Sequence, residues 1–286
     1  MDRLKREAYA KINLMLNISG VRADGYHTLE TVMQTVGLYD TIEICKKAEK
    51  GIVLQCDLPY VPSDERNIAW KAAQKFIDHT GYDGGLEIRI EKTIPVGGGM
   101  AGGSTNAAGV LNMLNEMCGM PLGDHELEAI ALTLGADVPF CLKKGTYLCE
   151  GIGEVMTRLA DMPKCFIVVC KPRASVSSKN AYGVFDQYTD QQHFDHTRMV
   201  RALQKRDVHA IAAAMGNSFE APIGELCPEI LEIKGKMLAM GALNAAMTGS
   251  GSVVFGLFDD VNKAHQAKNA LRAERYRTYC VRPVNR

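Results

Sequence analysis

The feature that most constrains this chain is a glycine-rich loop between a strand pattern and a helix pattern. Leu86–Ile90 alternates apolar and polar residues with a period of two, which predicts a half-buried strand. Five glycines follow within residues 97–103, and from Ala107 apolar residues recur at helical spacing until Gly119 and Pro121. This order brings bare backbone N–H groups and the positive end of a helix to one point. We therefore predict an anion site whose natural guest is a polyphosphate.

The same glycine-rich segment has three alternative interpretations: a Walker A loop, a dinucleotide-binding loop and a turn without a ligand. A Walker A loop ends in Gly-Lys-[Ser/Thr], and no lysine lies between Lys92 and the helix. Gly97, Gly99 and Gly102 satisfy G-x-G-x-x-G, but the acidic residue that should end a second parallel strand is Glu116, inside the helix pattern. A turn that merely packs closely is the last alternative. Tight packing alone rarely justifies the backbone entropy that so many glycines lose, so the sequence favours a phosphate loop.

Further patterns predict the rest of the secondary structure. The expected elements are a strand at 41–45, a helix from the N-cap Asp124 to Gly135, a strand at 166–170, helices at 199–215 and 228–240, a strand at 253–258, a helix at 261–273 and a strand at 276–281. The polar stretch 186–197 is either a lid or a loop. Strands and helices mix in both halves, which predicts an α+β chain with two domains, 1–158 and 159–286.

Composition narrows the class of partner and the compartment. The 286 residues carry 33 Lys plus Arg and 33 Asp plus Glu, so we expect no nucleic-acid partner and no membrane partner. No apolar string approaches the roughly 18 residues of a spanning helix, and the first residues lack the apolar region of a signal peptide. Nine cysteines without a C-x-x-C pair favour buried free thiols in a reducing compartment. We expect a cytoplasmic protein, and the sequence predicts no oligomeric state.

Four polar positions stand out, each with a structural alternative. Lys11 lies in an apolar run, where a lysine needs a partner or an exposed strand face, and an exposed face accounts for it better when it is read alone. Asp137 sits in a tight turn and could simply cap the next helix. Tyr26 and His27 follow the turn signal Asp24-Gly25, where a core tyrosine beside a solvated histidine is the alternative.

Three strings identify a family resemblance. Ala10-Lys-Ile-Asn-Leu14, the loop Gly97–Ala108 and Met247-Thr-Gly-Ser-Gly-Ser252 resemble the three motifs of the galactokinase, homoserine kinase, mevalonate kinase and phosphomevalonate kinase (GHMP) superfamily. Within it, Arg22–Leu29 and Leu134–Pro139 resemble the 4-diphosphocytidyl-2-C-methyl-D-erythritol kinases. Departures from the family pattern are Tyr9, where proline is common, and Met100, Ala101 and Thr105, where Leu, Gly and Ser are usual.

The resemblance implies a fold and a reaction. The fold is the two-domain GHMP kinase architecture, with an N-terminal domain like domain 2 of ribosomal protein S5, a ferredoxin-like C-terminal domain and a site between them. ATP with Mg²⁺ gives its γ-phosphoryl group to the 2-hydroxyl of the cytidyl-diphosphate methylerythritol, in the non-mevalonate route to isoprenoid precursors. No carboxylates stand at metal-ligand spacing, so we assign no protein ligand to the metal.

The resemblance also implies roles for individual residues. Lys11 and Asp137 match catalytic positions, the lysine as a fixed charge and the aspartate as acid/base. Substrate-binding positions are Asn13, Tyr26, His27, Ser178 and Tyr182, of which Tyr26, His27 and Tyr182 match the cytosine pocket. ATP-binding positions are Asn67, Lys92, Pro95, Val96, Gly97, Gly98, Gly99, Met100, Ala101, Gly102, Gly103, Ser104 and Thr105. For Lys92 a solvated side chain beside a strand is the alternative, and for 248–252 a hairpin turn with no ligand role.

Two further functions stay open. One is a GHMP kinase for another small alcohol, such as homoserine or mevalonate, and Tyr26, His27 and Tyr182 argue against it. The other is a nucleotide-binding sensor of the same fold that has lost catalysis, and the presence of Lys11 and Asp137 argues against it.

Overall fold

Two long strands carry the N-terminal part of the chain: β1 (Arg3–Val21) and β2 (His27–Lys47). The computed structural model describes residues 2–23 and 25–285, and these form two compact units. Unit 1 comprises the chain through Ala10, Leu38–Val96 and Ala101–Lys143, and unit 2 comprises Lys11–Gly37, Gly97–Met100 and the chain from Lys144 on. Both β1 and β2 therefore run from one unit into the other.

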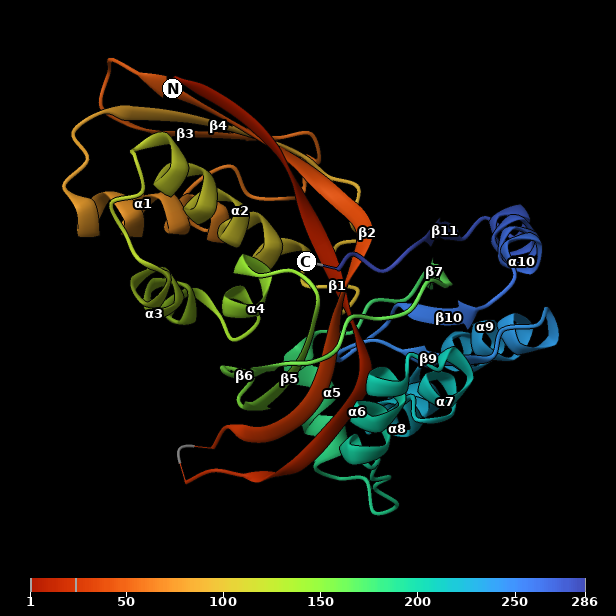
Figure 1. The fold of residues 1–286 in the computed structure, drawn as a ribbon. Coiled ribbons are helices and arrows are strands. Elements are labelled where there is room, and N and C mark those ends of the chain that lie inside the picture. The colour runs from red at the N-terminus through yellow and green to blue at the C-terminus, as the bar shows by residue number, and fades with distance from the viewer. Residues whose placement is uncertain (1, 24, 286) are drawn as a thin grey trace. The chain divides into compact units, whose positions relative to one another are not determined.

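Unit 1 combines three paired strands with helices. Its elements, besides the start of β1 and the end of β2, are β3 (Gly51–Cys56), α1 (Ile68–Thr80), β4 (Gly85–Glu91), α2 (Gly102–Met117), α3 (Asp124–Leu134) and α4 (Val138–Leu142). β4 pairs antiparallel with β2, from Thr41 opposite Glu91 to Lys47 opposite Gly85, and parallel with β3. The helices α1 and α2 lie on one face of these strands (Figure 1).

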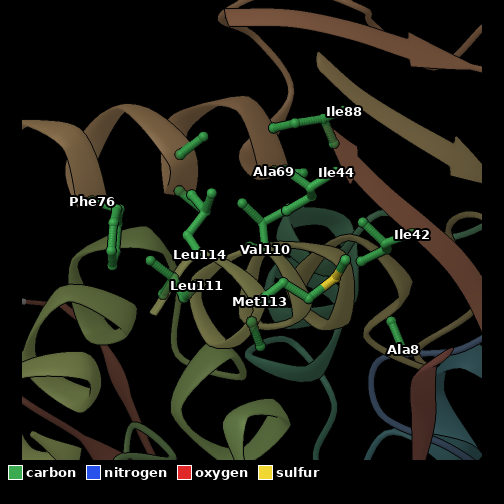
Figure 2. Packing of buried hydrophobic residues seen from close by; sticks show 14 of the residues in the cluster. Ala8, Ile42, Ile44, Ala69, Phe76, Ile88, Val110, Leu111, Met113 and Leu114 are labelled. Carbon is green, nitrogen blue, oxygen red and sulfur yellow. The ribbon is translucent and has the colours of Figure 1, made fainter. Parts of the chain in front are cut away.

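The core of unit 1 fills the space between these strands and the two helices. Figure 2 shows Ile42, Ile44 and Ile88 of the strands on the side of Val110 of α2, with Phe76 of α1 at the other end of the cluster, near Leu111. Burying each such side chain contributes roughly 1.5–3 kcal/mol. The predicted apolar positions of the glycine-loop helix are confirmed, since Ala107, Val110, Leu111 and Leu114 are all fully buried.

Unit 2 contains the remaining elements and two groups of paired strands. They are β5 (Thr146–Gly151), β6 (Val155–Arg158), β7 (Phe166–Lys171), α5 (Ser178–Phe185), α6 (His196–Lys205), α7 (Val208–Ala213), β8 (Gly216–Asn217), α8 (Glu220–Leu226), α9 (Pro228–Ala239), β9 (Asn244–Met247), β10 (Val254–Phe258), α10 (Val261–Ala273) and β11 (Arg277–Val281). One antiparallel sheet has the order β11-β7-β10-β9. In the larger sheet β1 pairs with β2, β5 pairs with β2 and with β6, and β8 runs parallel to β1.

Most of the predicted elements are confirmed, with three differences. The predicted helix 199–215 is two helices, because Arg206 is left-handed (φ 53°) and the Asp207 side chain caps α7. The N-cap of α3 is Gly123 rather than Asp124, and its N–H donates to the Glu126 carboxylate. Helix α1 was not predicted, although its buried residues Ala69, Ala72, Ala73 and Phe76 have helical spacing.

The domain boundary at 158/159 stays a prediction. The compact units follow a different division, because each draws on segments from before and after the glycine loop. In the stretch 186–197, the main chain at Phe194 is held by Asn17, whose Oδ1 accepts from the Phe194 N–H (2.8 Å) and whose Nδ2 donates to the Phe194 carbonyl. The Ser218 hydroxyl donates to the Gln192 carbonyl (2.9 Å). This end of the stretch is therefore anchored to unit 2.

Candidate active site

Lys11 is a buried lysine on β1, with 3% of its surface exposed. Its Nζ donates a hydrogen bond to Oδ1 of Asn13 (2.8 Å), which lies two residues on and hence on the same strand face. A buried ammonium needs such an acceptor to offset its lost hydration. The alternative of an exposed strand lysine is therefore wrong.

Asn13 connects Lys11 to two threonines. Its Nδ2 donates to the Thr31 hydroxyl (2.8 Å), and its main-chain N–H donates to the Thr248 hydroxyl (2.9 Å). The Thr248 hydroxyl donates in turn to Asn13 Oδ1 (3.2 Å). These contacts engage both ends of the Asn13 amide and hold it beside Lys11, and its contact with substrate stays a prediction.

The first half of the glycine loop packs against the turn at 248–252. Gly97 and Gly99 have positive φ angles of 64° and 78°, which glycine adopts at little cost. A Cβ on Gly99 would lie 2.1 Å from the Thr248 carbonyl oxygen, and the Gly98 carbonyl accepts from the Val253 N–H (3.2 Å). The third-motif turn and the first half of the glycine loop are thus in close main-chain contact within unit 2.

The second half of the loop leads into α2. Ala101 takes the left-handed conformation (φ 58°) at the N-cap, and no side chain caps the helix. Its first-turn N–H groups, at the positive end of the helix dipole, therefore receive no capping hydrogen bond from the N-cap side chain. Ala101 stands where glycine is usual in the family. Because alanine has a Cβ, the left-handed conformation costs it roughly 1–2 kcal/mol.

The loop residues differ in what they can offer an anion. Val96 is 41% exposed and Gly97 and Gly103 are exposed, whereas Pro95 and Met100 are buried. Thr105 is also buried, and its hydroxyl donates to the Tyr9 carbonyl. The Thr105 hydroxyl is thus engaged within the fold, and a place for Thr105 in ATP binding stays a prediction. The adjacent Ser104 is half-buried in the first turn of α2.

Lys92 forms a buried cluster with Asp40 and Asn106. Its Nζ donates to Asp40 Oδ2 and to Asn106 Oδ1 (2.9 Å), and its side chain is 5% exposed. The second Asp40 oxygen accepts from the N–H groups of Thr93 and Ile94 (2.7 and 2.8 Å). One carboxylate thereby fixes both the entry to the glycine loop and the start of α2. The alternative of a solvated Lys92 is wrong.

Asn67 is the N-cap of α1. Its Oδ1 accepts from the Ala69 N–H (2.9 Å), and its Nδ2 donates to the Pro62 carbonyl (2.7 Å). Both ends of this buried amide are thus engaged in holding the start of α1, and the role of Asn67 in ATP binding stays a prediction.

Asp137 precedes α4 in the turn that we predicted. It occupies the N-cap position, yet its side chain makes no capping hydrogen bond. Its main-chain carbonyl accepts from the Cys141 N–H (3.2 Å), and the residue is half-buried. The alternative that the Asp137 carboxylate caps the next helix is therefore wrong.

His27 and Tyr182 lie together in unit 2. Their rings stack with centroids 4.5 Å apart, and His27 Nε2 is hydrogen-bonded to Asp186 Oδ1 (2.7 Å). Tyr26 is 63% exposed, so it is not a core residue. The Arg22 N–H donates to the Tyr26 carbonyl (2.7 Å) and the Gly25 N–H to the Arg22 carbonyl (3.0 Å), which confirms a turn. Asp24 lies outside the described residues.

Ser178 is the first residue of α5, the helix that also carries Tyr182. Its Oγ lies 2.9 Å from Oγ of Ser250 in the third-motif turn. This hydrogen bond links the helix of the expected cytidine side to the turn beside the glycine loop.

Comparison with known proteins decides the family. The family described as GHMP kinases N terminal domain matches residues 67–145, and GHMP kinases C terminal matches residues 199–277. The 4-diphosphocytidyl-2-C-methyl-D-erythritol kinase of Clostridium beijerinckii is 43% identical over 98% of this chain and 100% of its own length. The Clostridium botulinum enzyme of the same name is 40% identical, over 97% and 99%. The chain belongs to the 4-diphosphocytidyl-2-C-methyl-D-erythritol kinase family of GHMP kinases.

Solved structures agree with membership of this kinase family. A crystal structure of 4-(cytidine 5'-diphospho)-2C-methyl-D-erythritol kinase has a TM-score of 0.85 and 33% identity, covering 99% of this chain and 100% of that one. Homoserine kinase from Cytophaga hutchinsonii has a TM-score of 0.78 at 19% identity, over 100% and 96%, and shares the fold. The predicted α+β, two-domain GHMP kinase fold is confirmed.

Three structural features bear on the partners and the redox state of this kinase. Among the described residues, no three His, Cys, Asp or Glu side chains gather as they would around a metal ion. Within 2–23 and 25–285, no helix has the length and apolar character needed to cross a bilayer. All nine cysteines are free thiols, four buried and five half-buried.

The sequence analysis missed Asp40, Asn106, Thr31 and Asp186. For Asp40 a signal exists, because it shares strand parity with the buried Ile42 and Ile44, so the period-two pattern places a carboxylate on the core face. Asp186 gives no such signal, because it meets His27 across 159 residues of sequence.

A matched pair of variants tests the contact between the loop and the turn. Gly97→Ala meets no atom within 4 Å, so it costs only about 1–2 kcal/mol for the left-handed conformation. Gly99→Ala carries the same cost and also collides with the Thr248 carbonyl. We expect it to lower the free energy of unfolding by at least about 2 kcal/mol more than Gly97→Ala does. Urea denaturation of both variants measures this difference, and equal losses would contradict the contact.

Proposed function

We propose that this kinase transfers the γ-phosphoryl group of ATP to the 2-hydroxyl of 4-diphosphocytidyl-2-C-methyl-D-erythritol, giving the 2-phosphate and ADP. The product would serve the non-mevalonate route to isoprenoid precursors in the cytoplasm. The observation that carries the proposal is the buried Lys11 amine, held by Asn13 on the strand whose main chain meets the glycine loop (Lys11 N–H to Met100 carbonyl, 3.3 Å). Full-length relatives of the same family, at 40–43% identity, support the choice of substrate.

The glycine loop supplies the donor side. A GHMP kinase uses ATP, and the left-handed Gly97 and Gly99 with the side-chain-free start of α2 suit a polyphosphate. The buried Asp40–Lys92 pair holds the loop entry, so little reorganisation is needed when a nucleotide binds. Preorganised donors of this kind stabilise the charge that grows on the transferring phosphoryl oxygens.

Mg²⁺ would enter this site with the nucleotide. The described residues contain no cluster of carboxylates that could cage the ion, and Mg²⁺ commonly binds through substrate phosphates with few protein ligands. Ser104, in the first turn of α2, is the side chain that we infer to contact it. When bound, the ion offsets negative charge on the phosphate oxygens.

Lys11 and Asp137 supply the acceptor side. The fixed positive charge of Lys11 favours ionisation of the alcohol and neutralises the equatorial phosphoryl oxygens. Asp137 accepts the proton of the 2-hydroxyl. In a loose phosphoryl-transfer transition state the proton leaves late, so a well-placed carboxylate suffices even though it is a weak base.

The cytidine end would bind at Tyr26, His27 and Tyr182. Tyr26 is exposed for stacking, and Tyr182 lies with His27 in unit 2. Stacking of one base on one aromatic ring is worth about 1–3 kcal/mol. Asp186 fixes the ring of His27, which we infer reads the polar edge of the base.

One assay separates the candidate functions. Release of ADP, coupled to NADH oxidation, is measured with the cytidyl alcohol, homoserine and mevalonate. We expect turnover with the cytidyl alcohol alone. Comparable turnover with homoserine or mevalonate would favour another GHMP alcohol kinase, and no ADP with any acceptor would favour a nucleotide sensor.

Asp137→Asn tests the proton acceptor. The amide cannot take the hydroxyl proton, so we expect kcat to fall by about 10²-fold or more while ATP affinity stays within about twofold. The control is Asp124→Asn, in the first turn of α3. Steady-state kinetics and nucleotide titration provide both values, and a kcat within tenfold of the wild type would remove Asp137 from the mechanism.

His27→Ala tests the cytidine site. Loss of the ring removes its contact with the base and its stacking on Tyr182, so we expect the KM for the cytidyl alcohol to rise roughly tenfold with the KM for ATP unchanged. His209→Ala, a surface histidine paired with Asp259, serves as the control. An unchanged KM for the alcohol would contradict the assignment.

A further inference from the structure

Lys171 is a buried lysine outside the catalytic residues proposed above. It ends β7 and has 9% of its surface exposed. Its Nζ donates to the carbonyls of Pro172 and Ala174 (2.9 and 2.6 Å) and to the hydroxyls of Ser175 and Ser252 (each 3.0 Å). Within the described chain it forms no ion pair. The ammonium is thus surrounded by neutral oxygens, much as a bound monovalent cation would be.

Burying the Lys171 ammonium away from water costs free energy, so its hydrogen bonds must offset that cost. Burial lowers the pKa of the Lys171 amine from its ordinary value, because the charged form loses hydration and gains no carboxylate in hydrogen-bonding contact. A buried methionine of similar length would avoid this cost. The hydrogen bonds from the amine to the surrounding oxygens are the interaction that offsets this cost.

The oxygens that accept from Lys171 Nζ belong to two segments of the chain with different positions in the site. Ser252 closes the third-motif turn, whose Thr248 carbonyl lies against Gly99 and whose Thr248 hydroxyl bonds to Asn13. Pro172, Ala174 and Ser175 belong to the segment that leads to Ser177, the N-cap of α5. The Ser252 hydroxyl also donates to the Ala174 carbonyl (2.6 Å), so the two segments bond directly to each other next to the ammonium.

We propose that Lys171 is a positioning residue that holds the 172–177 segment, and with it α5, against the third-motif turn. It thereby fixes Ser178 and Tyr182 of the cytidyl side relative to the turn that supports the phosphate loop. The hydrogen bond between Ser178 and Ser250 is a second link between the same two parts. The assignment of α5 to the cytidyl substrate rests on the function proposed above.

Lys171→Met tests the proposal, because it keeps the length of the side chain and removes the donors. The glycine loop keeps its own bonds to Val253 and Thr248, so we expect the KM for ATP to stay within threefold. The KM for the cytidyl alcohol should rise at least tenfold, and kcat should fall. Lys171→Arg, which keeps donors and charge, should recover much of the loss. Lys46→Met is the matched control, since Lys46 Nζ also donates to a main-chain carbonyl, that of Met117 in unit 1.

Hydrogen exchange supplies a readout that needs no activity. In Lys171→Met, the amides of 173–177 and 248–252 should both exchange at least tenfold faster than in the wild type, with α1 and α2 unchanged. Uniform acceleration across both units, or equal increases of both KM values, would indicate a purely structural role and overturn the proposal. If wild-type protein does not phosphorylate the cytidyl alcohol while the paired exchange effect is present, the proposed function fails and the positioning role stands.

Discussion

The close approach of two main-chain segments is the constraint on which the rest of this site depends. The glycine loop lies against the Thr248 carbonyl at a distance that no side chain on Gly99 would allow. Because the loop is seated there, Thr248 can bond to Asn13, and Asn13 can hold Lys11. The position of the Lys11 ammonium thus depends on Gly99, because a Cβ at that residue would push the loop away from Thr248.

Buried charge is handled in two ways around this arrangement. In unit 1, Lys92 meets a carboxylate, and Asp40 has further N–H donors on its second oxygen, so the pair is well satisfied. In unit 2, Lys11 and Lys171 bond to neutral oxygens of an amide, of carbonyls and of hydroxyls. Of these two lysines, Lys171 forms no ion pair within the described residues, and a buried ammonium of this kind still presents a positive field, which suits an enzyme that handles phosphates.

The sequence predicted the parts of this protein that depend on local pattern. The strand at 86–90, the phosphate-loop helix and the turn before Asp137 all follow from periodicity and from glycine or proline punctuation. The resemblance to GHMP kinases supplied the reaction and the residue types. The sequence could not supply the partners of those residues. The Thr105 hydroxyl donates to the Tyr9 carbonyl, and Asn13 accepts from Lys11, and neither contact was predicted. Both outcomes depend on contacts between segments that are distant in sequence, which no local pattern encodes.

The division of the chain into interleaved units has a consequence for its synthesis on the ribosome. Every segment of unit 1 has been translated once Lys143 is added, whereas Lys11–Gly37 must wait for the chain beyond Lys144 before unit 2 is complete. Domains generally fold in the order of their synthesis, so a nascent chain can close the first core while the middle of β1 and the start of β2, although paired with each other, still lack the part of unit 2 that follows Lys143. The residues that belong to the incomplete unit 2 at that stage include Lys11 and Asn13. A translational pause shortly after position 143 would prolong the time for which they are exposed.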